Sequence, residues 1–142
     1  MEGELTKMAL IEWNETYSVQ VEEMNRQHRR LIELINQLDS AMRMGKGKDV
    51  LGVIINDLAK YTTTHFTAEE SLFLKYNYPA ASAQKAMHQL FIDKVNDFRK
   101  KYEEGSIALS VQVIDFLSDW LKKHIMVEDK KYGPFLNEKG IK

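Results

Sequence analysis

The sequence predicts an all-α protein that folds as an up-down-up-down antiparallel four-helix bundle with an N-terminal extended arm. Its 142 residues suit one domain. Glycine and proline gather at a few breaks, and the stretches between them are rich in residues that lose little rotamer freedom in a helix. Apolar residues there recur at steps of three and four. We expect an arm at 1–18, in which Trp13 and Tyr17 pack over one end of the bundle, a bundle at 19–136 and a tail at 137–142.

The first two helices are predicted at about 19–43 and 49–76. The break that contains Gly45 and Gly47 ends the first helix. The second ends just before Pro79, because proline disfavours helical geometry in the residue that precedes it.

The third helix is predicted to start near Pro79, which a first helical turn tolerates, and to end at Gly105. The fourth is predicted at about 109–131 and is expected to stop at Gly133 and Pro134. The connections are short, so neighbouring helices should run antiparallel.

The composition excludes several functional classes. The 20 basic and 21 acidic residues give a formal net charge of −1, so no broad basic field is available for nucleic acid or anionic lipid. There is no cysteine, which excludes disulfides, thiolate zinc sites, iron–sulfur clusters and a cysteine nucleophile. Apolar runs are short, so we expect no membrane span, no secretory signal and a cytoplasmic location.

The four histidines share the buried stripe of the predicted helices. One falls on each helix, at His28, His65, His88 and His124. If each landed on a two-in-seven seam at random, the joint chance would be roughly 1% or less. A single buried histidine is more often satisfied by a hydrogen bond, but four that converge leave many polar nitrogens in need of partners. Their depths agree within a turn or two, so one shared metal site is predicted.

Two carboxylates extend this predicted site. Glu69 lies four residues after His65 on the same helix face, although it could also be a solvated member of a Glu-Glu pair. Glu128 lies four residues after His124, about 40° around an ideal helix, whereas Asp129 lies about 140° around. Spacing therefore selects Glu128, and only a local widening such as a π-bulge would turn Asp129 inward.

Nitrogen and oxygen ligands without sulfur suit iron, manganese or zinc, and several histidines with two carboxylates indicate a two-metal site. Ferritin-like di-iron proteins instead carry a Glu-x-x-His pair on each of two helices. That pair is absent, because the residues three before the histidines are Asn25, Thr62, Lys85 and Leu121. An apolar pocket should surround the metals, and Leu121 and Ile125 flank His124 on its helix face.

The combined motifs resemble the hemerythrin family, specifically its bacterial single-domain branch, over about 10–136. The matching pieces are Gln27-His28, His65-Phe66-Thr67-Ala68-Glu69, Tyr78-Pro79 with His88 further on, and Trp120-Leu121-Lys122-Lys123-His124 followed by Asp129. Each piece alone is weak, but the combination is specific.

The resemblance implies two non-haem iron ions, bridged by oxo and carboxylate groups, that bind dioxygen reversibly. It implies His28 and His65 as ligands of one iron, and His88 and His124 as ligands of the other. It also implies Glu69 and Asp129 as the bridges, so it favours Asp129 over Glu128. The expected protein is a monomer for dioxygen storage, delivery or sensing that takes dioxygen or small anions and is not an enzyme.

The sequence departs from the family pattern at Gln84, where the family has a third histidine for the second iron. A glutamine oxygen is a weaker donor than imidazole. Gln84 could ligate, leave a vacancy for water or an anion, or leave a mononuclear site. The alternative functions are therefore a peroxidase-like, nitric-oxide or anion-binding protein, and a metal-binding bundle that no longer carries oxygen.

Overall fold

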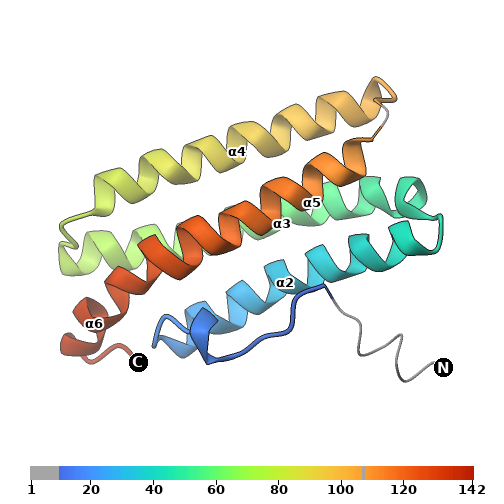
Figure 1. Ribbon diagram of the computed structural model, residues 1–142. Helices are drawn as coiled ribbons and strands as arrows, with labels where there is room; N and C mark the ends of the chain where they lie inside the picture. Colours follow the sequence, from blue (N-terminus) through green and yellow to red (C-terminus); the bar gives the residue numbers. More distant parts are fainter. Residues whose placement is uncertain (1–9, 107) are drawn as a thin grey trace.

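The computed structural model describes residues 10–106 and 108–142, and it shows four helical rods packed side by side (Figure 1). The elements are a 3-10 turn η1 (Glu15–Tyr17), α2 (Glu22–Arg43), α3 (Gly47–Tyr76), α4 (Ala81–Glu103), α5 (Leu109–Trp120), a π-helix η2 (Leu121–Asp129) and α6 (Lys130–Glu138). The last three form one continuous rod. The predicted all-α four-helix bundle is confirmed. None of the described helices combines the length and the apolar character needed to cross a membrane.

The rods end at the breaks that the sequence predicts. Gly45, with φ +72°, follows α2, and Gly105, with φ +75°, follows α4. Glycine adopts this left-handed conformation without steric cost. The helix α3 ends at Tyr76 and is followed by Asn77, which also has a positive φ of 56° and lies two residues before Pro79. Local chemistry therefore sets these three ends.

The N-terminal arm lies along α2 and not over one end of the bundle as expected (Figure 1). The Ile11 N–H donates to Asn36 Oδ1 at 3.0 Å, and Asn36 Nδ2 donates to the Ile11 carbonyl at 2.8 Å. The Arg29 guanidinium stacks 4.4 Å from the centre of the Trp13 ring. These contacts fix the arm against the middle of the helix. Residues 1–9 of the predicted arm lie outside the described residues.

The fourth rod does not stop at Gly133 and Pro134, so that prediction is wrong. The helix α6 continues through Pro134 to Glu138. Tyr132 and Leu136 are fully buried on either side of the proline, and their packing holds the helix together although proline removes one backbone donor. Gly133 serves close packing instead, because a Cβ there would lie 2.2 Å from the Val19 carbonyl oxygen.

We therefore expect Gly133→Ala to lower the free energy of unfolding by about 2 kcal/mol, because backbone on both sides of this contact must move. Urea unfolding of the metal-free protein measures the change. Gly52→Ala is the matched control, since its Cβ would meet only the end of the half-exposed Tyr102 side chain, 2.7 Å from Oη. An equal loss in both variants would contradict the close-packing role of Gly133.

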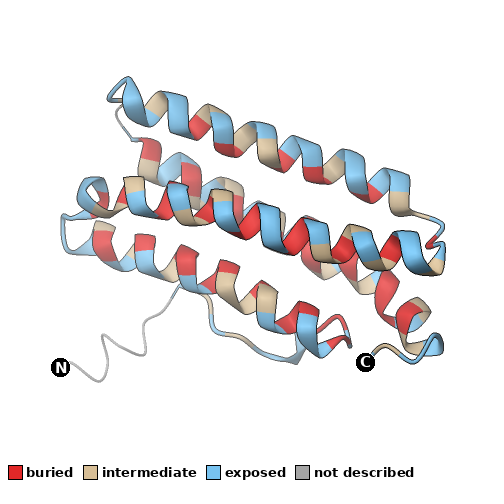
Figure 2. Cartoon of the chain, turned by 180° about the vertical axis from the view of Figure 1, so that it is seen from behind, coloured by how far each residue is buried: buried red, intermediate tan, exposed pale blue. Residues whose placement is uncertain are grey.

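The buried faces of the rods point inward (Figure 2), and the apolar core has two parts. The larger part surrounds Leu31, Leu58 and Leu117. The smaller surrounds Phe73 and Tyr132 at the other end of the bundle. Along the helices, the buried histidines and carboxylates fall between these two parts. Apolar packing above and below thus fixes the rods that carry the polar site.

Candidate metal centre

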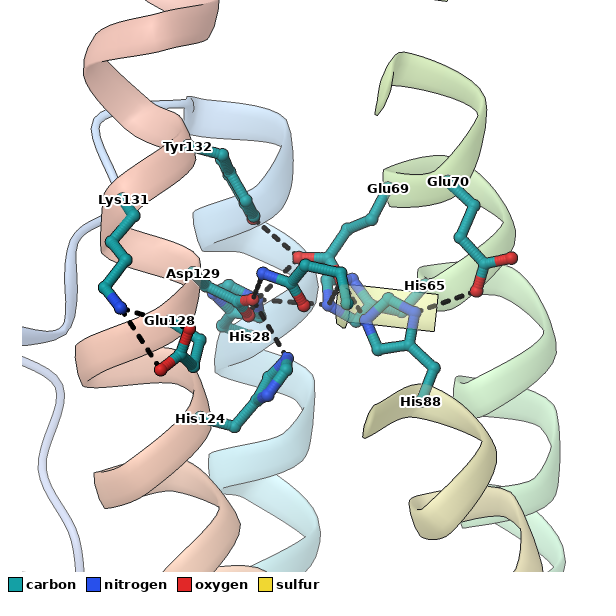
Figure 3. Close-up of polar contacts among 11 residues, drawn as sticks. His28, His65, Glu69, Glu70, His88, His124, Glu128, Asp129, Lys131 and Tyr132 are labelled. Atoms are coloured by element: carbon teal, nitrogen blue, oxygen red, sulfur yellow. Dashed lines mark hydrogen bonds and ion pairs between the residues drawn. The ribbon is translucent and has the colours of Figure 1, made fainter. Parts of the chain in front are cut away.

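Seven polar side chains, contributed by all four rods, are buried together in the interior of the bundle (Figure 3). Each has at most 3% of its surface exposed. They are His28 on α2, His65 and Glu69 on α3, Gln84 and His88 on α4, and His124 and Asp129 on η2. Burial of so many polar groups is costly unless they bind one another or a shared partner.

Glu69 lies at the middle of the cluster and contacts histidines from three rods. Its Oε1 is 3.3 Å from His65 Nε2 and 3.1 Å from His88 Nε2. Its Oε2 is 3.7 Å from His28 Nε2. Glu69 Oε1 thus lies between His65 and His88, and Oε2 faces His28, so one carboxylate joins the His28 and His65 side to the His88 side.

Asp129 spans the cluster in a similar way. Its Oδ2 is 3.3 Å from His28 Nε2, and its Oδ1 is 3.0 Å from His124 Nε2. Gln84 Nε2 also donates to Oδ1, at 2.9 Å. Two carboxylates therefore each lie between two groups of imidazole nitrogens, which is an arrangement that can bridge a pair of cations.

The π-helix η2 brings Asp129, and not Glu128, into this cluster. In a π-helix the hydrogen bonds join residues five apart, so residue i+5 takes the facing position that i+4 has in an α-helix. Asp129 accordingly shares a face with His124. Glu128 lies near the surface and accepts from Lys131 Nζ at 3.3 Å. The choice of Glu128 from ideal spacing is wrong, and the wider helix is the reason.

Several buried atoms of the cluster have no hydrogen-bond partner within the described chain. They are His28 Nδ1, Glu69 Oε1, Asp129 Oδ2, Gln84 Oε1, His88 Nε2 and both nitrogens of His124. Nε2 of His28 and Nε2 of His65 also face each other at 3.1 Å. A cation at the centre would satisfy the inward-facing atoms, which are the carboxylate and amide oxygens and the Nε2 atoms of His88 and His124. Ligand atoms of His28, His65, Glu69 and Asp129 already lie within 4.8 Å of one another, so the donor set fits a metal.

Polar side chains behind the cluster hold its members in place. His65 Nδ1 lies 2.7 Å from Gln27 Oε1, and His88 Nδ1 lies 2.8 Å from Glu70 Oε2. Because these oxygens accept from Nδ1–H, they leave the Nε2 lone pairs directed inward. Tyr132 Oη donates to Glu69 Oε2 at 2.7 Å.

The sequence did not predict these supporting roles. In the sequence, Glu70 stands out only as the neighbour of Glu69 in a Glu-Glu pair, and Gln27 only as part of the Gln27-His28 motif. Tyr132 lies three residues after Asp129 on the same helical rod, and this spacing alone places its side chain close to that of Asp129.

Aromatic and aliphatic side chains enclose the cluster. The Phe66 ring stacks on His88 with centroids 3.9 Å apart, and Trp120 stacks on His124 at the same distance. Leu121 and Ile125, the predicted pocket residues, are fully buried on the rod that carries His124. These side chains keep bulk water away from the imidazoles.

The charges of the cluster shift its protonation. Burial alone would lower the pKa of His28, but the Asp129 and Glu69 carboxylates outweigh it and raise that pKa to about 9. Burial lowers the pKa of His65 despite the same carboxylates. Burial would raise the pKa of Glu69, yet the neighbouring imidazoles, His65 first, hold it well below its ordinary value. Without metal, a protonated His28 thus lies beside a neutral His65 and an ionised Glu69.

Comparison with known proteins identifies the family. Residues 19–136 match the family model described as the hemerythrin HHE cation binding domain. A bacteriohemerythrin of Stenotrophomonas maltophilia is 33% identical, over 89% of this chain and 81% of the relative. A bacteriohemerythrin of Methylococcus capsulatus is 30% identical, over 92% of this chain and 99% of the relative. The crystal structure of a wild-type hemerythrin superposes with a TM-score of 0.79 at 30% identity, over 89% of this chain and 97% of the other. The chain therefore belongs to the hemerythrin family.

Proposed function

We propose that this protein holds two non-haem iron ions and binds dioxygen reversibly. His28 and His65 would hold one iron, His88 and His124 the other, and Glu69 and Asp129 would bridge them. The carrying observation is that each carboxylate lies between the two groups of imidazole nitrogens, at 3.0 to 3.7 Å. Ferrous iron bound there supplies the electrons that make dioxygen binding possible.

The remaining residues prepare the site for this task. Gln27 and Glu70 fix the ring orientation of His65 and His88, and such supporting contacts raise ligand basicity. Tyr132 holds one oxygen of Glu69. The buried Leu121 and Ile125 exclude water and stray protons, which favours release of intact dioxygen over irreversible oxidation.

Anaerobic loading with ferrous iron followed by exposure to air tests this proposal. We expect two irons per chain by metal analysis, visible oxo-to-iron charge-transfer bands after air is admitted, and loss of these bands under argon. One iron per chain would refute the two-iron site. Two irons with bands that do not reverse would refute reversible oxygen binding.

Gln84 supports a second candidate function, the binding or turnover of small anions and peroxide. As a glutamine it brings no imidazole to the His88 and His124 side, and its Nε2 donates to Asp129 Oδ1 at 2.9 Å. A position open to an exogenous ligand follows if Gln84 Oε1 does not ligate. Sustained peroxide consumption by the iron-loaded protein, without bleaching of its bands, would favour this function over oxygen carriage.

Metal affinity should depend steeply on pH. The pKa of His28, about 9 in the metal-free protein, means that its proton must leave before iron binds. His65, whose pKa is lowered, is already neutral near pH 7. We expect ferrous affinity to rise at least about tenfold per pH unit from pH 7 to 8.5 and to level off above pH 9. Anaerobic chelator competition measures it, and an affinity independent of pH in this range would contradict the protonated His28.

A further inference from the structure

Tyr61 carries a buried hydroxyl group that the proposed centre does not use. It lies one helical turn before His65 on α3, and only 6% of its surface is exposed. Its ring lies nearly parallel to the His65 ring, with centroids 5.1 Å apart and an angle of 17°. The Oη has no hydrogen-bond partner within the described chain. Buried hydroxyl groups are normally paired, so this one needs an explanation.

The position of Tyr61 points to the missing partner. The helix α3 and the rod that carries His124 run in the same direction, so Tyr61 and Leu121 both precede their histidines on the same end of the centre. Tyr61, Leu121 and Ile125 belong to one apolar cluster. Glu69, Asp129 and Tyr132 lie further along their rods, toward the opposite end. Tyr61 therefore lies at the same end of the centre as Leu121, within the apolar cluster that contains both.

The hydroxyl remains a donor at all ordinary pH values. Burial, and then the charges of Glu69 and Asp129, raise the pKa of Tyr61 well above its usual value. A neutral phenol in apolar surroundings can donate strongly to an anion or to a ligand that gains negative charge.

We propose that Tyr61 Oη donates a hydrogen bond to the small ligand held at the centre and so selects ligands that carry negative charge. The inference rests on the proposed iron site. It assigns Tyr61 a specificity-determining role, and it explains why a polar group lies unpaired among apolar side chains.

Azide titration of the iron-loaded protein tests this role. Tyr61→Phe keeps the ring and its stacking on His65 but removes the donor. We expect the azide Kd to rise on the order of 10- to 100-fold, the usual range for a hydrogen bond to a charged group. Tyr102→Phe, the same change at a side chain 41% exposed, should leave the Kd unchanged. An unchanged Kd in Tyr61→Phe with intact charge-transfer bands overturns the proposal.

Metal-free protein supplies a readout that does not depend on iron. Because Oη has no partner within the described chain, Tyr61→Phe should unfold at the same or a higher temperature than wild type. A lower unfolding temperature would show a structural role and overturn the assignment. A wild-type protein that forms the iron site but binds no azide overturns it too, whereas failure to form the site overturns the proposed function first.

The infrared stretch of azide bound to the wild-type protein provides a further test that needs no variant. A donated hydrogen bond should make this frequency differ between H₂O and D₂O. The absence of any difference would overturn the role of Tyr61 even if Tyr61→Phe could not be loaded with iron.

Discussion

Replacing Asp129 with alanine should weaken iron binding by more than about 100-fold, whereas Glu128→Ala, one residue earlier, should leave it unchanged. Asp129 Oδ1 and Oδ2 lie 3.0 Å from His124 Nε2 and 3.3 Å from His28 Nε2, so its loss removes a ligand from both sides of the proposed centre. Changes to groups that merely support a ligand already cost 10–100-fold in metal affinity. Iron per chain after gel filtration and chelator competition measure the effect.

Stability must be separated from metal binding in this experiment. Asp129 also accepts from Gln84 and balances the charge of His28, so its removal should destabilise the metal-free protein by about 3 kcal/mol. Asp129→Asn keeps the shape of the side chain and one carbonyl oxygen, and circular dichroism of the metal-free variant establishes that it folds. If a folded Asp129→Asn protein retained wild-type iron affinity, Asp129 would not be a ligand.

The contrast between Glu128 and Asp129 also shows a feature of the site that residue spacing could not predict. An ideal helix places residue i+4 beside His124, and that geometry selected Glu128. The structure instead contains a nine-residue π-helix, Leu121–Asp129, in which residue i+5 faces the centre. No residue type in this segment indicates that a π-helix will form. The resemblance to a family, and not the spacing, pointed to Asp129.

Other features were predictable because they depend on local chemistry. The helix ends at Gly45 and Gly105 follow from backbone conformations that glycine adopts easily. The convergence of His28 and His65, whose Nε2 atoms lie 3.1 Å apart, follows from apolar spacing on antiparallel helices. The bond between Glu70 and His88 joins two rods. Its existence depends on the rotation of each rod, which spacing on one helix does not define.

Gln84→His should increase the iron affinity of the His88 and His124 side by about 10- to 100-fold and weaken the binding of azide. Gln84 lies one turn before His88, is 1% exposed, and already reaches Asp129 at 2.9 Å. An imidazole of similar size at this position would replace the weak amide donor with a strong one. The rate of iron release to a chelator and the azide Kd measure the two effects.

Gln84→Leu separates the three roles that the sequence left open for Gln84. The leucine removes both amide atoms but fills a similar space. If Gln84 Oε1 ligates iron, this variant should lose affinity while Gln84→His gains it. If the position is open to an exogenous ligand, Gln84→Leu should keep its iron and still bind azide, and only Gln84→His should block it. If the wild-type side is too weak to retain iron, only Gln84→His should hold two irons per chain. An equal iron content, release rate and azide affinity in all three proteins would show that Gln84 does not influence the centre.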